Sequence, residues 1–333
     1  MKNRTRLYSL AFVCLLGFMA APSCSDDTPA VQLDPDVENP EGTPDEKPEE
    51  KPEEKPEEKP DDGGENQNKP DGEAGLSEEL LQKLQSIYDP ADIGPQQVTT
   101  VHQLAILTSY CASAEVAGPI TVTSAALNGR DITLVTLGGT EDKEGQATTM
   151  KESQLASFGK PNDYLSAVSK LFANGTVPKG KPVLLTGISL GGMIAQQLLS
   201  DSLVAADYEL CGIITFGSPI NLPLDRRGVK VVRFADANDK VPQLGEIVVR
   251  TGMATPGMSK QELKETLELL DEKEKIVRTS QYTDMIETHA LSYIDEPCWN
   301  DVDFLGNPEK HNVLELKEKL TFYPAPKLPE TNK

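Results

Sequence analysis

Hydrophobic residues along the chain follow two spacings from about residue 96 onward. Apolar residues at alternate positions or in short continuous runs predict strands, whereas apolar residues three and four positions apart predict helices. The expected strands cover residues 120–127, 132–137, 183–186, 212–216 and 229–234, and the expected helices cover residues 77–87, 96–112, 162–172, 190–199, 259–270 and 313–320. Because strands and helices alternate through the middle of the chain, we expect an α/β fold with a mostly parallel central sheet flanked by helices.

One pair of expected strands is joined by Asn128-Gly129, which is typical of a two-residue hairpin turn. The first strand, 120–127, alternates polar and apolar residues. The returning strand, 132–137, is more continuously apolar, which indicates a buried position in the sheet.

The first 23 residues have the pattern of a secretory signal, because three basic residues precede an apolar run that is too short to span a bilayer. Small residues before Cys24 resemble the lipobox of bacterial lipoproteins, in which the cysteine is acylated. We therefore expect residues 1–23 to be a lipoprotein signal peptide and Cys24 to be the lipidation site that anchors the protein in a membrane. Simple cleavage after Ala20 or Ala21 is the alternative. Acidic residues after Cys24 resemble an export tag, which predicts an outer membrane lipoprotein exposed at the cell surface.

Residues 24–75 are acidic and rich in Pro, Glu and Lys, with repeats of Lys-Pro-Glu-Glu from residue 47. Proline at every fourth position forbids a continuous helix, and the acidic charges repel one another. We expect a disordered stalk here, with a specific binding segment as the alternative. The core-forming residues lie in 76–333, which is long enough for one domain.

Charge narrows the range of partners. The chain has 53 acidic and 32 basic residues and a formal net charge of −21. Nucleic-acid binding needs an excess of Lys and Arg, so no nucleic-acid partner is expected. The sequence shows no metal-ligand cluster and no dinucleotide fingerprint, so neither a metal nor another cofactor is expected, and we expect a monomer.

The five cysteines fit this organisation. Cys14 leaves with the signal and Cys24 is the predicted lipidation site, which leaves Cys111, Cys211 and Cys298. An odd number in an oxidising compartment allows at most one disulfide. Cys211 opens a strand-like run and is expected to be a buried thiol, so a Cys111–Cys298 bridge is one hypothesis.

The strongest chemical motif is Gly187-Ile-Ser189-Leu-Gly191, with an apolar strand before it and a helical pattern after it. A nucleophile on a sharp turn from strand to helix has a crowded backbone, and glycines on both sides remove the Cβ atoms that would collide there. The motif therefore predicts Ser189 as a nucleophile. The alternative is a glycine-rich turn with an inert serine.

A serine nucleophile needs a histidine base, and that base needs an acid to orient it. In this architecture the chain order is serine, acid, histidine. His102 precedes Ser189 in the chain, so this order excludes it as the base. His289 and His311 remain as candidates. The acid is expected just after the strand 229–234, where Asp239 is favoured and Asp236 competes.

Several motifs together resemble the class 3 (fungal-type) lipase family of the α/β-hydrolase superfamily. The matching segments are 104–112, the strand that ends in Gly138-Gly139-Thr140, Gly187-Ile-Ser-Leu-Gly-Gly192, Thr215-Phe-Gly-Ser-Pro219, Asn238-Asp239-Lys240-Val241-Pro242 and His289-Ala-Leu-Ser-Tyr293. They follow the family's order and span about residues 96–298. Gly138 stands where the family usually has Arg, and Ile188 where it usually has His.

The resemblance implies a catalytic triad of Ser189, Asp239 and His289. It also implies an oxyanion site formed by Thr140 and by the backbone N–H of Leu190, the residue after the nucleophile. Thr140 as a simple turn residue remains the alternative.

These patterns predict a serine hydrolase of lipase or esterase type that acts on carboxylic esters, with an ester or lipid as its substrate. A short-chain deacylase of glycan- or peptide-linked acyl groups is one alternative, and an inactive binding module on a hydrolase scaffold is another. The segment 141–159 is the candidate lid, and it is polar and short for a full helical lid. We therefore expect weak or no interfacial activation and a preference for short or medium acyl chains. The helix 259–270 is expected to pack on the domain, with a mobile cap as the alternative.

Overall fold

The computed structural model describes residues 95–110, 118–141, 144–244, 258–294, 296–307 and 311–328. All of them belong to one compact unit. The predicted signal, Cys24, the stalk and the helix expected at 77–87 lie outside the described residues, and so does Cys111. The Cys111–Cys298 bridge therefore stays a prediction.

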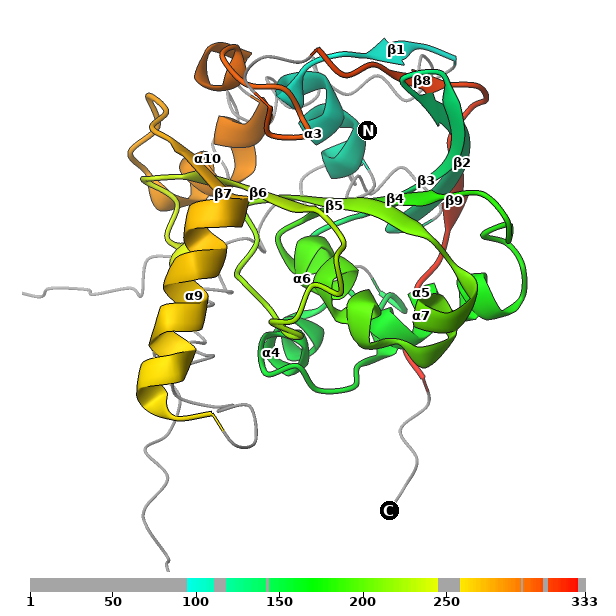
Figure 1. Cartoon of the computed structure of the whole chain (residues 1–333), viewed down its shortest axis with the longest axis horizontal. Coiled ribbons are helices and arrows are strands. Elements are labelled where there is room, and N and C mark those ends of the chain that lie inside the picture. Colours follow the sequence, from blue (N-terminus) through cyan, green and yellow to red (C-terminus); the bar gives the residue numbers. More distant parts are fainter. Residues whose placement is uncertain are drawn as a thin grey trace, which may run out of the picture. The chain divides into compact units, whose positions relative to one another are not determined.

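Nine strands of the described residues form one mixed sheet (Figure 1). They are β1 (Gln97–Val98), β2 (Ile120–Leu127), β3 (Arg130–Leu137), β4 (Val183–Ile188), β5 (Leu210–Phe216), β6 (Val231–Asp236), β7 (Lys275–Arg278), β8 (Leu314–Leu316) and β9 (Thr321–Tyr323). Across the sheet their order is β1-β8-β2-β3-β4-β5-β6-β7, and β9 also pairs with β2. Strands β3 to β7 are parallel neighbours, whereas β2 is antiparallel to β3, β8 and β9. The predicted α/β class with a mostly parallel sheet is confirmed.

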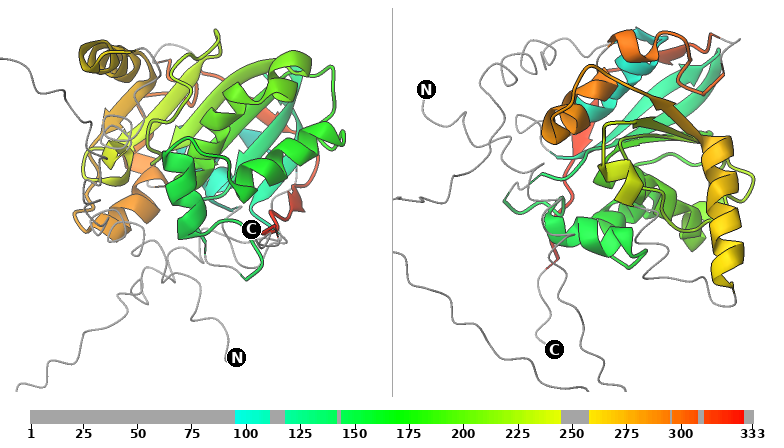
Figure 2. Two further views of the ribbon diagram at one scale, coloured as in Figure 1. Left: turned by 90° about the horizontal axis from the view of Figure 1, so that it is seen from below. Right: turned by 90° about the vertical axis from the view of Figure 1, so that its left-hand side faces the viewer.

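Helices cover both faces of the sheet (Figure 2). The helical elements are α3 (Val101–Ser109), α4 (Met150–Ser157), α5 (Asp163–Ala173), α6 (Leu190–Gln197), η3 (Leu198–Ser200), α7 (Ser202–Asp207), α9 (Lys260–Glu274), α10 (Met285–Leu291), η4 (Ser292–Ile294) and η5 (Glu296–Trp299). Residues of α4 to α7 share one core with the sheet, and residues of α3, α10, η4 and η5 share the core on the opposite face. Successive strand residues point to opposite faces, so Leu184 lies in the second core and Leu185 in the first.

The hairpin between β2 and β3 follows the sequence prediction. Leu127 pairs with Arg130, so Asn128 and Gly129 form the two-residue turn. Both turn residues have positive φ, +51° and +81°. A turn of this hand matches the twist of the two strands, and Asn and Gly are the residues that adopt it most readily.

The helix predicted at 313–320 is wrong, because this segment contributes β8 and leads into β9. Leu314 and Leu316 are buried and Glu315 between them is exposed, which is strand periodicity. β8 pairs with one half of β2 and β9 with the other half. The backbone groups on the edge of β2 that does not face β3 need hydrogen-bond partners, and residues 314–316 and 321–323 supply them. This pairing explains why the segment is extended.

The helix predicted at 96–112 begins later than expected. Residues 97–98 form β1 beside β8, and the helix α3 starts at Val101. Thr100 is the N-cap, in an extended conformation, and its hydroxyl oxygen accepts the Gln103 N–H. The Gln103 side-chain oxygen in turn accepts the Thr100 N–H. This capping box fixes the helix start at a point that the apolar pattern does not mark.

The helix predicted at 259–270 is α9, which begins after its cap Ser259 and runs on to Glu274. Leu263 and Leu267 are buried against Ile220 and Leu224, so α9 packs on the domain as expected. Among the described residues, no helix combines the length and the apolar character needed to cross a membrane.

Candidate active site

Ser189 lies on the sharp turn between β4 and α6. Its backbone angles are φ +52° and ψ −120°, a conformation that residues other than glycine rarely adopt. A Cβ on Gly187 would lie 2.4 Å from the backbone of Gly191, and one on Gly191 would lie 2.1 Å from the carbonyl oxygen of Leu137. Both glycines are therefore required by the close packing of the turn, as the motif predicts.

The turn is also tied to the neighbouring strand. The Ser189 N–H donates to the carbonyl oxygen of Phe216 at the end of β5, over 2.9 Å. The Ser218 hydroxyl donates to the carbonyl oxygen of Ser189 over 2.6 Å. These bonds hold the strained backbone in one conformation, which is the condition for storing strain at a functional site.

Asp239 and His289, predicted as acid and base, are hydrogen-bonded to each other. His289 Nδ1 lies 2.8 Å from Asp239 Oδ2, and Asp239 is fully buried. The Val241 N–H donates to Asp239 Oδ1 over 2.9 Å, so both carboxylate oxygens have donors. The competing Asp236 has a different role: its carboxylate accepts the N–H groups of Asn238 and Ser280 and so shapes the loop after β6.

The short helix α10 carries His289 in its last turn, and its first turn is capped by the Asp284 side chain. The His289 side chain is 13% exposed. A Cβ on Gly217 would lie 3.1 Å from His289 Cε1, so the imidazole lies against the backbone that directly follows Phe216. Ser189 is hydrogen-bonded to Phe216, and the end of β5 therefore connects the predicted nucleophile to the predicted base.

Electrostatics at His289 favour a base that accepts a proton. Burial disfavours the imidazolium, but the Asp239 carboxylate opposes this through its charge and its hydrogen bond. The balance raises the pKa of His289 above its ordinary value.

The predicted oxyanion segment passes directly over Ser189. A Cβ on Gly139 would lie 3.3 Å from Ser189 Cβ, so a larger residue here would press on the serine side chain. The Thr140 hydroxyl lies 2.7 Å from the Ser153 hydroxyl of α4. Among the described residues, the backbone N–H groups of Thr140 and Leu190 have no hydrogen-bond acceptor. They are therefore available to a ligand at Ser189.

The candidate lid segment, 141–159, contains α4 in the part that follows residue 143. Glu152 is buried and accepts the Asp163 N–H over 2.7 Å. The Ala156 carbonyl oxygen accepts the side-chain amide of Asn221 over 2.9 Å and that of Gln197 over 3.3 Å. These bonds join α4 to α5, α6 and the loop after β5, so α4 is part of the packed body of the domain.

The remaining histidines and Cys211 lie apart from this arrangement. His311 is exposed, and His102 lies on α3. Burial raises the pKa of the Cys211 thiol to about 11, so it stays protonated and unreactive at neutral pH. No group of three or more metal-ligating side chains occurs in the described ranges.

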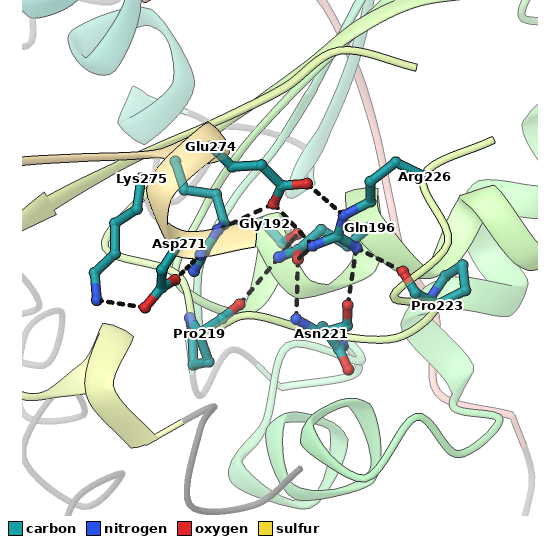
Figure 3. A network of polar contacts seen from close by, with 10 residues as sticks. Gly192, Gln196, Pro219, Asn221, Pro223, Arg226, Asp271, Glu274 and Lys275 are labelled. Carbon is teal, nitrogen blue, oxygen red and sulfur yellow. Dashed lines mark hydrogen bonds and ion pairs between the residues drawn. The ribbon is translucent and has the colours of Figure 1, made fainter. Parts of the chain in front are cut away.

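An ionic cluster that the sequence patterns did not reveal contacts α6 (Figure 3). It consists of the buried Arg226, Arg233 and Glu274 and of the half-buried Asp271 and Lys275. Arg226 donates to both oxygens of Glu274, over 2.8 and 3.0 Å, and Arg233 pairs with Glu274 and Asp271. Lys275 completes the cluster through Asp271 at 3.2 Å.

Gln196 connects the ionic cluster to α6. Its side-chain oxygen accepts from Arg226 Nη2 at 3.2 Å and from the Asn221 N–H at 2.9 Å. Its amide donates to the carbonyl oxygens of Gly192 and Pro219, at 3.1 and 3.0 Å. The helix that starts at Ser189 is thus fixed to α9 through a chain of satisfied polar groups.

We expect Glu274→Gln to lower the free energy of unfolding by about 3–5 kcal/mol, because it leaves two buried arginines without their shared carboxylate. Glu268→Gln, on the exposed side of the same helix, is the matched control and should cost at most about 1 kcal/mol. Urea titration of the two variants measures the difference. Equal midpoints would show that the cluster contributes nothing to stability.

The Ser189 turn and the Asp239–His289 pair therefore both adjoin the end of β5, in the parallel part of the sheet. Comparison of the chain with models of protein families, with curated proteins and with solved structures gave no match.

Proposed function

We propose that the protein is a serine hydrolase of the α/β-hydrolase type that cleaves carboxylic esters, in particular lipid esters. One observation supports the proposal: the predicted acid and base are hydrogen-bonded at 2.8 Å, and the end of β5 contacts both this pair and the strained Ser189 turn. An inert serine would need neither the strained backbone nor a buried Asp–His pair beside it.

In the proposed mechanism His289 is the general base. The Asp239 carboxylate accepts a hydrogen bond from the N–H at His289 Nδ1, which leaves Nε2 as the acceptor for the Ser189 hydroxyl proton. As Nε2 takes this proton, Ser189 Oγ attacks the ester carbonyl carbon. The tetrahedral intermediate collapses, and the imidazolium returns the proton to the departing alcohol. A water molecule, deprotonated by Nε2, then attacks the acyl carbon of the acyl-enzyme. The imidazolium returns this proton to Ser189 Oγ as the bond to the acyl group breaks and the acid leaves.

The backbone N–H groups of Thr140 and Leu190 are the proposed oxyanion donors. Their lack of acceptors among the described residues supports this role. The Ser153 hydroxyl holds the Thr140 hydroxyl, which fixes the segment before the substrate arrives. Donors that are already in place need no reorganisation in the transition state, and each is worth about 3–4 kcal/mol in well-studied hydrolases.

Short or medium acyl chains are the proposed substrates within the ester class. The packing of α4 supports this, because a helix held by Asn221, Gln197 and Asp163 gains little by opening at a lipid surface. The same observation favours the second candidate, a short-chain deacylase that acts on acyl groups linked to glycans or peptides.

A fluorophosphonate probe tests the proposal directly. We expect stoichiometric labelling of the intact protein, with the modified peptide containing Ser189. We also expect hydrolysis of p-nitrophenyl esters that is fastest for short or medium chains and falls toward palmitate. Heat-denatured protein is the control for non-specific labelling. Absence of both labelling and hydrolysis would favour an inactive binding module.

A further inference from the structure

Tyr293, in η4, donates a hydrogen bond to the carboxylate that orients the proposed base. Its hydroxyl donates to Asp239 Oδ2 over 2.7 Å, and this is the same oxygen that lies 2.8 Å from His289 Nδ1. The Asp236 N–H in turn donates to the Tyr293 oxygen over 3.1 Å. The polar groups therefore form a continuous chain from a backbone amide, through a phenol, to the acid and the imidazole.

Close packing holds the ring of Tyr293 in the orientation that directs its hydroxyl at Asp239. Tyr293 is fully buried and stacks on Trp299 with ring centroids 5.9 Å apart. Phe216 packs against it at 6.4 Å, and a Cβ on Gly217 would lie 2.8 Å from its ring. Trp299 is itself fixed by a hydrogen bond to the Ser292 carbonyl oxygen, 2.8 Å long. Packing of this kind places a hydroxyl far more accurately than a surface side chain could.

From this geometry we infer that Tyr293 is a positioning residue of the proposed hydrolase site: it fixes the Asp239 carboxylate and limits the negative charge that Asp239 presents to His289. Two donors share Oδ2, so each receives less of the charge than a single donor would. Donation from the Asp236 N–H polarises the phenol and strengthens its hydrogen bond to Asp239. Tyr293 touches no substrate and acts only through Asp239. The inference rests on the proposed function for its kinetic part alone.

The charged neighbours of this series of hydrogen-bonded groups are two carboxylates. Asp236, the last residue of β6, and Asp239, in the loop after β6, act on the Tyr293 hydroxyl, and Asp239 also acts on His289 of α10. Burial and the charge of Asp239 raise the pKa of Tyr293 well above its ordinary value. The phenol consequently remains a donor throughout the pH range in which His289 titrates.

Tyr293→Phe removes the hydroxyl and keeps the ring. Asp239 then presents more charge to His289, so the imidazolium is stabilised and the pKa of His289 should rise by about 0.5 units. Tyr208→Phe is the matched control, because Tyr208 is a buried tyrosine whose hydroxyl donates to the Phe172 and Val177 carbonyl oxygens far along the chain from the site. It should leave the pKa of His289 unchanged.

The deciding measurement is an NMR titration of the imidazole signals, which needs no substrate. The chain has three histidines, and His102→Ala and His311→Ala variants assign the signals. An upward shift in Tyr293→Phe alone supports the inference. An unchanged or lower pKa, or an equal shift in Tyr208→Phe, overturns it.

Kinetics of the same variants separate this inference from the proposed function. For an active wild type, kcat/KM requires neutral His289, so its acid limb should move to higher pH by the same 0.5 units. We expect kcat in Tyr293→Phe to fall about tenfold while KM stays unchanged. The concentration of active sites used to calculate kcat comes from titration with the fluorophosphonate probe. A wild type without hydrolysis or labelling would refute the proposed function, and the NMR titration would still decide the role of Tyr293.

Discussion

Ser189→Ala should lower kcat/KM for p-nitrophenyl esters by about 10³-fold or more, since it removes the proposed nucleophile and leaves only binding and oxyanion stabilisation. The fold should be unaffected. Alanine meets the same backbone strain at φ +52° as serine does, and the hydrogen bonds of the turn come from main-chain atoms and from Ser218.

A serine elsewhere provides the control for this result. Ser166 of α5 donates its hydroxyl to the Asn162 carbonyl oxygen, and Ser166→Ala should keep full activity. Urea titration of both variants shows whether folding is intact. Activity of Ser189→Ala within tenfold of the wild type would remove Ser189 from the mechanism.

His289→Ala is the second large effect that we expect, with a loss of activity similar to that of Ser189→Ala. The serine hydroxyl is a weak nucleophile without its base, so the two residues act as one unit. The double variant should therefore be little worse than either single variant, because the second substitution removes a group that no longer has a function.

The matched control for the base is His311→Ala, which replaces an exposed histidine and should be nearly silent. Ser189→Ala, His289→Ala, the double variant and His311→Ala should all be measured with both the ester assay and the probe assay. Loss of activity in His311→Ala together with an active His289→Ala would transfer the role of base to His311.

Local patterns predicted the parts of the structure that neighbouring residues determine. The hairpin at Asn128-Gly129 and the turn at Ser189 each need particular residues within a few positions, so the sequence motif and the backbone agree. The strand β4 and the start of α6 likewise follow from an apolar run and a helical pattern on either side of that turn.

Long-range contacts determine what the patterns left undecided. Asp236 ends β6 and Asp239 lies three residues later, and the packing of α10 against the end of β5 decides which of them contacts His289. The segment 314–316 has too few residues to distinguish strand from helix by periodicity. Asp271 and Glu274 resemble the solvated charges of an exposed helix face, but both pair with arginines from distant segments, and Glu274 is buried.

The pairing of β8 and β9 with β2 has a consequence for how the domain is synthesised. The Val313 N–H donates to the Asn128 side chain, 185 residues earlier in the chain, and both late strands follow that contact. Until the ribosome has released them, one edge of β2 remains open to any other extended chain. Loop closure over such a separation slows folding, so the nascent domain needs protection from premature association while the rest of its sheet is already able to form.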